Sequence, residues 1–292
     1  MITRPGPLSA RANAHVYYMK ENGIRIDKTA KDKEWGFTAA SRPRFIAGSD
    51  VGALICHGFG GTPANMRCLI EAAAELGLTV SAPLLSGHAA TMGDMQKHGW
   101  LDWRDDVDSA YDKLASSGCK EIYLCGLSMG ALLMADLAAR RCAEGKIKGV
   151  VMICPPVKMK AYLNFSARAL WPFAPYVLTA DSFRPDPDAE MYYGMATKKL
   201  NEIIGLSSAV KKHAAEITVP VTLIEAGRDN RVDPVSYRIL QKKLADCEHT
   251  VIEDAPHGIP YSAEADKLVE IFKEYLARRL KLHDKNDPTG GK

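Results

Sequence analysis

Long hydrophobic runs are missing from this 292-residue sequence. A helix that crosses a bilayer needs about 20 predominantly apolar residues, and no stretch of the chain reaches that length. The first residues, MITRPGPLSARANA, also lack the apolar centre of a secretory signal. We therefore expect no stable membrane insertion and a cytoplasmic location.

An excess of one charge is likewise missing. The chain holds 38 Lys and Arg residues against 35 Asp and Glu residues, which gives a formal net charge of +3. No dense basic stripe is interleaved with aromatic residues, the pattern that is typical of nucleic-acid binding. The sequence therefore predicts no nucleic-acid partner, and it leaves the oligomeric state open.

Paired cysteines and clustered metal ligands are absent too. The seven cysteines are odd in number and show no C-x-x-C motif. Cys56, Cys125 and Cys154 each lie in an apolar, strand-like run, which predicts reduced and buried thiols. Because His, Cys and Asp residues do not cluster at ligand spacing, we expect neither a metal nor an organic cofactor.

The chain does have short apolar runs that alternate with amphipathic stretches of about 12 residues. This alternation predicts an α/β fold with a mostly parallel central sheet flanked by helices. The predicted strands are Val51–Cys56, Leu78–Ala82, Glu121–Cys125, Val150–Cys154, Val219–Glu225 and Thr250–Glu253, and the predicted helices are Pro63–Leu76, Asp102–Ser116, Ala131–Cys142 and Ala263–Leu280.

The alternation fails in two segments. Residues 1–44 show no clear periodicity, so we expect a peripheral N-terminal extension. Residues 155–218 are rich in aromatic residues and prolines, too long for a loop and too irregular for a strand–helix–strand unit. We predict that they form a small helical cap over a core of residues 45–154 and 219–292.

The strongest chemical signal is Gly126-Leu-Ser-Met-Gly130, between a predicted strand and a predicted helix. In that context G-x-S-x-G describes a nucleophile elbow, a turn so sharp that its serine takes a strained backbone conformation. The residues two before and two after the serine must lack side chains, and both are glycines. Ser128 is therefore the candidate nucleophile, at a helix N-terminus that favours developing negative charge.

A serine hydroxyl needs a base, and the base needs a carboxylate to orient it. His257 follows the last predicted strand and has the chain position and loop context of the base. Asp229 follows an earlier strand, and Asp233 is its main competitor. We favour Asp229 because it lies nearer the strand end, whereas Asp254 is too close to His257 in sequence to reach round its ring.

Acyl transfer also needs hydrogen-bond donors for the oxyanion. We expect one from the backbone N–H of Met129 and one from that of Phe59, in the glycine-rich loop HGFGG. His57, Gly58 and Gly60 of this loop are the candidate substrate-binding residues. A phosphate cradle is disfavoured, because the loop has neither a G-K-[ST] ending nor a G-x-G-x-x-G pattern.

Together these motifs resemble the bacterial carboxylesterase and monoacylglycerol lipase group of the α/β-hydrolases, over roughly residues 50–280. The matching segments are His57-Gly-Phe-Gly-Gly-Thr-Pro63, Met66-Arg67, Ala82-Pro-Leu-Leu-Ser-Gly-His88, Trp100-Leu-Asp-Trp-Arg-Asp-Asp-Val107, Gly126-Leu-Ser-Met-Gly130, Gly227-Arg-Asp229 and His257. The resemblance implies a serine hydrolase with Ser128 as nucleophile, Asp229 as acid and His257 as base. It also implies a cap in the place of residues 155–218.

The sequence departs from this group in three places. Ala131 and Ala89 stand where relatives often carry glycine, and residues 1–44 have no counterpart. Alanine is small, so we expect the first two departures to leave activity intact.

The predicted activity is hydrolysis of small-molecule esters, of short to medium chain length or monoacylglycerols, through an acyl-enzyme. Aromatic and aliphatic residues of the cap indicate an apolar acyl site, although they serve equally to bury the cap's own core. A thioesterase or acyltransferase would use the same residues. A non-enzymatic binding protein of the same fold is disfavoured by the intact nucleophile, base and acid.

Overall fold

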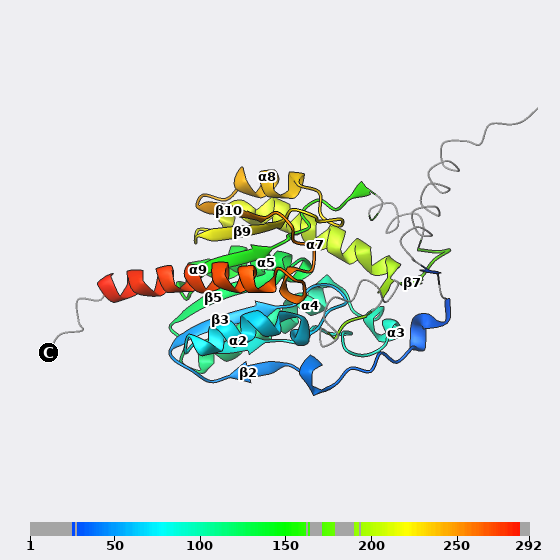
Figure 1. The fold of residues 1–292 in the computed structure, drawn as a ribbon, viewed down its shortest axis with the longest axis horizontal. Helices are drawn as coiled ribbons and strands as arrows, with labels where there is room; N and C mark the ends of the chain where they lie inside the picture. Colours follow the sequence, from blue (N-terminus) through cyan, green and yellow to red (C-terminus); the bar gives the residue numbers. More distant parts are fainter. Residues whose placement is uncertain are drawn as a thin grey trace, which may run out of the picture.

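The computed structural model describes residues 25–26, 28–161, 163, 171–178, 190–192 and 194–286. Its centre is a seven-stranded sheet in the order β10-β9-β6-β5-β3-β4-β2 (Figure 1). Neighbouring strands are parallel except β2 and β4 at one edge, which are antiparallel. The strands are β2 Arg44–Ile46, β3 Val51–Cys56, β4 Thr79–Ala82, β5 Glu121–Leu127, β6 Ile147–Ile153, β9 Val221–Ala226 and β10 Cys247–Ile252.

The central strands are apolar along most of their length because both faces of the sheet are covered. β3, β5 and β6 read VGALIC, EIYLCGL and IKGVVMI, and nearly all of their residues are buried. Parallel strands bring their C-terminal ends to one edge, so the loops that follow β3, β5, β9 and β10 meet there. The predicted fold class, a mostly parallel sheet flanked by helices, is confirmed.

Two helical layers enclose the sheet. α2 and α9 contact each other on the face that lies in front in Figure 1, and α4, α5 and α7 pack together as the second layer. The helices are α2 Arg67–Glu75, α3 Met92–Met95, α4 Trp100–Ser116, α5 Met129–Arg141, α7 Leu200–His213, α8 Val235–Gln241 and α9 Ala265–Asn286, with 3-10 turns at Lys28–Asp32, Ala39–Ser41, Pro63–Met66, Cys142–Glu144, Thr197–Lys199, Ala214–Glu216 and Ile259–Tyr261.

The segment 155–218 contains more than the helices expected from its composition. Its helix α7 packs on α5 and α4, and so extends a helical layer of the core. Its strands β7, Tyr176–Leu178, and β8, Gly194–Ala196, form a small antiparallel sheet with β1, Arg25–Ile26. Composition could not reveal these short strands, because their pairing joins segments far apart in the sequence. The division into core, cap and extension stays a prediction.

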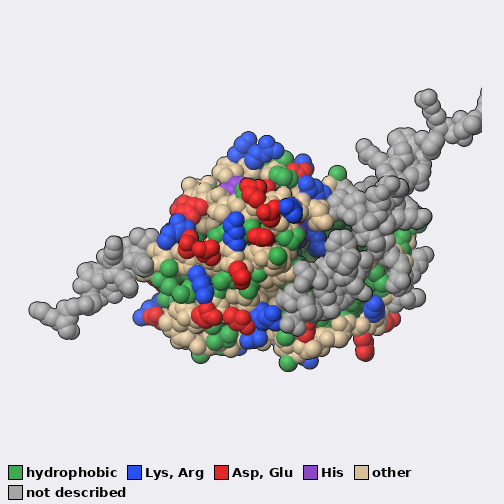
Figure 2. Space-filling view, viewed as in Figure 1, with side chains coloured by type: hydrophobic (Ala, Val, Ile, Leu, Met, Phe, Trp, Pro, Cys, Tyr) green, Lys and Arg blue, Asp and Glu red, His purple; other side chains and the backbone are tan. Residues whose placement is uncertain are grey.

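The surface of the described residues mixes both charges. Figure 2 shows basic and acidic side chains interspersed on the face that it presents. Some are paired, as where Lys273 of α9 lies 2.6 Å from Glu75 of α2. Within the described ranges, none of the helices combines the length and the apolar character that a membrane span requires.

Candidate active site

Ser128 lies on the turn that joins β5 to α5. Its backbone has a φ of 55° and a ψ of −117°, a positive-φ conformation that residues with a side chain rarely adopt. Its N–H donates to the carbonyl of Ile153 on β6 at 2.7 Å, and its carbonyl accepts the N–H groups of Ala131 and Leu132 in α5. The strained turn predicted from the motif is present.

Close backbone contacts require both glycines of the motif. A Cβ atom at Gly126 would lie 2.4 Å from the carbonyl of Gly130, and one at Gly130 would lie 2.5 Å from the carbonyl oxygens of Cys56 and His57. These separations are far shorter than van der Waals contact. The elbow is therefore pressed against the end of β3, which fixes Ser128 relative to the loop that follows β3.

The loop after β10 brings His257 to Ser128. The Nε2 atom of His257 lies 2.9 Å from Ser128 Oγ, and its Nδ1 atom lies 2.8 Å from Asp229 Oδ2. An ionised carboxylate only accepts, so Nδ1 carries the proton and Nε2 can accept the proton of the serine. The three predicted residues thus lie in the order that general-base activation of a serine needs.

Asp229 is held by the backbone of its own turn after β9. Its Oδ1 atom accepts the N–H groups of Arg231 and Val232 at 2.7 and 2.9 Å, which leaves Oδ2 for His257. Burial raises the pKa of this carboxyl, but His257 and the two backbone donors outweigh burial, so the pKa lies below its ordinary value. Asp229 is therefore ionised at neutral pH.

Asp233, the competing carboxylate, has other partners. Its Oδ1 atom accepts the N–H of Val235 at 3.0 Å, and its Oδ2 atom lies 3.1 Å from Lys158 Nζ. The preference for Asp229 that followed from chain position therefore agrees with the geometry.

The loop after β3 brings backbone donors to the same site. Gly58 and Phe59 line a cavity together with Ser128. Among the described residues, the N–H groups of Phe59 and Met129 donate no hydrogen bond. Met129 is the first residue of α5, where the helix dipole favours an anion. Both predicted oxyanion donors are therefore available to a ligand.

His57 and Gly60 support this loop and do not line the cavity. The buried His57 ring donates from Nδ1 to the Gly58 carbonyl at 2.9 Å, and its Nε2 atom accepts the Leu85 N–H at 3.1 Å. The Gly60 N–H donates to His88 Nε2 at 3.1 Å. Of the candidate substrate-binding residues, the structure brings only Gly58 to the cavity.

His88 is a support that sequence reasoning named only as part of a motif. Its ring packs edge-on against His57 and Phe59, and also contacts Trp103. Burial lowers the pKa of both histidines, that of His57 to about 4. Both rings therefore stay neutral at physiological pH and keep accepting backbone N–H groups.

Tyr192 joins the segment 155–218 to the same loop. Its N–H donates to the Gly60 carbonyl at 2.9 Å. Its hydroxyl donates to the Gly87 carbonyl at 3.1 Å and accepts the N–H of Ala90 at 3.0 Å. No local sequence pattern indicated these contacts, because the partners lie far apart in the chain.

The cavity beside Ser128 is largely apolar. The described part of the segment 155–218 contributes aliphatic and methionine side chains, and methionine adapts readily to irregular ligands. The polar exceptions include Arg231 and Asn65, and the buried Nδ2 atom of Asn65 has no hydrogen-bond partner among the described residues. The lining residues are Gly58, Phe59, Gly61, Asn65, Leu127, Ser128, Pro156, Met159, Leu163, Met191, Met195, Leu200, Ile203, Arg231, His257 and Tyr261.

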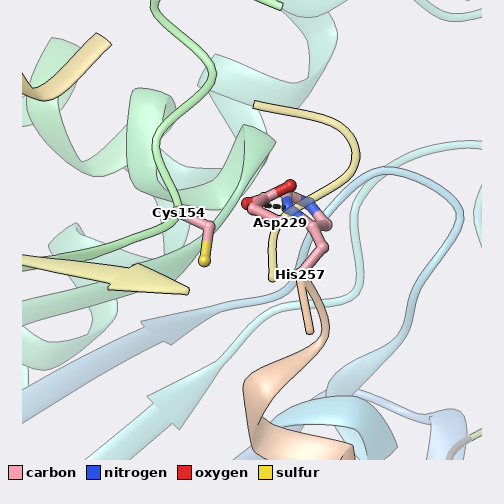
Figure 3. A group of neighbouring side chains, drawn as sticks. All are labelled: Cys154, Asp229 and His257. Atoms are coloured by element: carbon pink, nitrogen blue, oxygen red, sulfur yellow. Dashed lines mark hydrogen bonds and ion pairs between the residues drawn. The ribbon is translucent and has the colours of Figure 1, made fainter. Parts of the chain in front are cut away.

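One group of described residues has the atoms to hold a metal ion. The potential ligand atoms of Cys154, Asp229 and His257 all lie within 4.8 Å of one another (Figure 3). The dashed line in Figure 3 marks the hydrogen bond that already joins Asp229 to His257. Burial and the Asp229 charge raise the pKa of the Cys154 thiol, which disfavours the thiolate that a metal would bind. The group is better suited to proton transfer, and the lack of a metal stays a prediction.

Comparisons with known proteins agree with this geometry. The family model described as Serine aminopeptidase, S33 matches residues 50–264. A thermostable monoacylglycerol lipase of Bacillus sp. (strain H-257) is 26% identical over 249 residues, covering 84% of this chain and 98% of that protein. A carboxylesterase of Bacillus subtilis is 25% identical over 242 residues, covering 81% and 96%.

Solved structures share the fold. A metagenome-derived lipolytic enzyme aligns with a TM-score of 0.74 at 24% identity, over 83% of this chain and 98% of its own. A monoacylglycerol lipase of Paleococcus ferrophilus aligns with a TM-score of 0.66 at 21% identity, over 81% and 98%. At these identities the likeness establishes the fold.

Replacing His88 with leucine removes the acceptor of the Gly60 N–H and keeps the space filled. We expect kcat for a p-nitrophenyl ester to fall about tenfold, with a smaller change in KM, because the loop that carries Phe59 loosens. His88→Gln retains an acceptor and should recover part of the loss. His213→Leu, at an exposed histidine that faces Glu216, is the control. An unchanged kcat in His88→Leu would contradict the supporting role.

Acid should destabilise the protein through His57. Its pKa is about 4 in the folded chain and about 6.5 in an unfolded one. The unfolded state therefore binds more protons between these values, and stability falls as the pH drops through this window. Between pH 7 and pH 5 this residue should cost about 2 kcal/mol of unfolding free energy. Urea unfolding at pH 7 and pH 5 measures the decrease in unfolding free energy between the two pH values. In His57→Gln this decrease should be smaller by about 2 kcal/mol. An equal decrease in the wild type and the variant would rule the mechanism out.

Proposed function

Because the chain belongs to the serine aminopeptidase S33 family and is an ester-cleaving hydrolase with the α/β-hydrolase fold, we propose that Ser128, His257 and Asp229 are its catalytic triad. One observation carries this proposal: the unbroken series of contacts from Ser128 Oγ through His257 to Asp229, at 2.9 and 2.8 Å. Its residues all lie within the range that the family model matches.

In the acylation step, Ser128 Oγ attacks the ester carbonyl while His257 Nε2 takes the serine proton. The N–H groups of Phe59 and Met129 bind the oxyanion that forms. Asp229 stabilises the imidazolium and keeps the proton on Nδ1. His257 then gives its Nε2 proton to the leaving alcohol, which departs and leaves an acyl-enzyme.

Deacylation uses the same groups in reverse. His257 Nε2 takes a proton from water as the water oxygen attacks the acyl carbon, and the two backbone donors again hold the oxyanion. Collapse of that intermediate returns the proton to Ser128 and releases the carboxylic acid. Each residue thus returns to its starting state.

The proposed substrates are neutral or weakly polar monoesters with an apolar acyl group of short to medium length, monoacylglycerols included. The aliphatic and methionine lining of the cavity supports an apolar acyl site. The names of two relatives, a monoacylglycerol lipase and a carboxylesterase, agree with this substrate class. We also propose a cytoplasmic location, because all seven cysteines are free thiols, the state maintained in a reducing compartment.

Ser128→Ala should abolish ester hydrolysis, with a loss in kcat of roughly 10⁴-fold or more. A series of p-nitrophenyl esters from acetate to palmitate, assayed beside the wild type, measures the loss, and the preferred length sizes the acyl site. A folded Ser128→Ala protein that keeps turnover would overturn the assignment. Labelling of the wild type by a fluorophosphonate, absent in the variant, is an independent check.

Asp229→Asn should lower kcat by about 10³–10⁴-fold, because an amide at this position no longer enforces the tautomer with its proton on Nδ1. Asp233→Asn is the matched control, since Asp233 has its own partners in Val235 and Lys158. Steady-state kinetics on the preferred ester compare the two. A severe loss in Asp233→Asn together with a mild one in Asp229→Asn would transfer the role to Asp233.

A further inference from the structure

A permanently charged side chain lines the largely apolar cavity. Of the described residues that line it, only Arg231 carries a permanent charge, and none is a carboxylate. Within the described part of the chain, the Arg231 side chain makes no hydrogen bond and no ion pair. The side chain is partly exposed, and a guanidinium offers five N–H donors to a ligand. The triad chemistry does not use this charge.

The backbone of Arg231 is firmly held. Its N–H donates to Asp229 Oδ1 at 2.7 Å, and its carbonyl accepts the N–H of Lys160 at 2.9 Å. The next residue, Val232, forms an antiparallel bridge with Met159, another cavity residue. The start of the side chain is therefore fixed at the cavity wall.

The charge of Arg231 acts on a second cavity residue. Burial raises the pKa of the Tyr261 hydroxyl, and the Arg231 charge is the largest influence that lowers it. Tyr261 lines the same cavity as Arg231.

Arg228, on the same turn, is an arginine that has a structural partner. Its Nη2 atom is bonded to Asp254 Oδ1, and its side chain is 71% exposed. It does not line the cavity. The two arginines share a turn, but only Arg231 lines the cavity, and it has no counter-ion among the described residues.

The reaction geometry identifies the part of the substrate that meets Arg231. The carbonyl oxygen must lie at the N–H groups of Phe59 and Met129, and the leaving oxygen must lie at His257 Nε2. Arg231 belongs to the turn that holds the partner of His257, and Tyr261 follows His257 in its own loop. The leaving alcohol therefore departs near the two chain segments that carry Arg231 and Tyr261.

We propose that Arg231 binds an anionic group, a carboxylate or a phosphate, on the alcohol part of the ester. Among the monoesters that the site accepts, those with an anionic alcohol should then be cleaved faster than their neutral counterparts. A guanidinium matches both anions with two parallel hydrogen bonds. This inference rests on the proposed function. The balance of the reaction is unchanged: water and ester give a carboxylic acid and an alcohol that keeps its anionic group.

Two butyrate esters that differ in the charge of the leaving phenol test the proposal. The substrates are 4-carboxyphenyl butyrate and 4-carbamoylphenyl butyrate, and the measured quantity is the ratio of their kcat/KM values in each protein. This ratio cancels differences in active enzyme between preparations. We expect it to be about 10- to 100-fold lower in Arg231→Gln than in the wild type, with Arg231→Lys between them. The wild-type ratio should also fall with added salt.

Two further measurements complete the test. 4-Phosphonophenyl butyrate replaces the carboxylate with a phosphonate. The anionic ester with the larger kcat/KM relative to the neutral 4-carbamoylphenyl ester carries the preferred anion. Arg228→Gln is the matched control on the same turn, and its ratio should equal that of the wild type. A wild-type ratio that Arg231→Gln leaves unchanged overturns the proposal.

The acyl side is tested separately with 4-nitrophenyl hydrogen glutarate and 4-nitrophenyl pentanoate. If Arg231→Gln changes the charge selectivity for this acyl-side pair but not for the leaving-phenol pair, the assignment to the leaving alcohol is overturned. Failure of the proposed function has a different signature, because the neutral esters would then show no hydrolysis that depends on Ser128. Hydrolysis that depends on Ser128 but shows no charge preference overturns only the role of Arg231.

Discussion

The contact of Gly130 with the carbonyl groups of Cys56 and His57 is the constraint on which the rest of the site depends. It leaves no room for a side chain, so the start of α5 lies directly against the end of β3. The strained conformation of Ser128, worth about 1–3 kcal/mol, persists because α5 is buried over most of its length. One packing contact therefore sets both the position of the serine hydroxyl and the distance to the loop of Phe59.

The buried ionisable groups near the site are held in different charge states. Asp229 is surrounded by donors, so its charge is retained in spite of burial. His57 and His88 accept backbone N–H groups, so their neutral forms are retained. The same low-dielectric surroundings thus support one fixed negative charge next to His257 and uncharged rings beneath the oxyanion loop. The result is an electrostatic environment that is set before a substrate arrives.

The sequence predicted what depends on local spacing. Ser128, His257 and Asp229, which the structure brings together, were proposed because a sharp turn and a loop after a strand leave clear signatures. Asp229 was preferred to Asp233 because it lies nearer a strand end. Contacts between segments that are distant in the sequence could not be predicted in this way. Examples are the hydrogen bonds of His88 and Tyr192 and the pairing of β1 with β7. The spacing of apolar residues predicted the core strands, but it did not predict where α7 lies. This helix packs with the core although it follows an irregular stretch.

Tyr192 couples two segments of the site through its hydrogen bonds. Because its backbone binds Gly60 and its hydroxyl bridges Gly87 and Ala90, the segment that carries Met191 of the cavity and the loop that carries Phe59 share one set of hydrogen bonds. A change in the position of one of these segments therefore changes the position of the other, and such a coupling is reciprocal. The lining of the cavity and the loop that carries Phe59 are in this way linked through Tyr192.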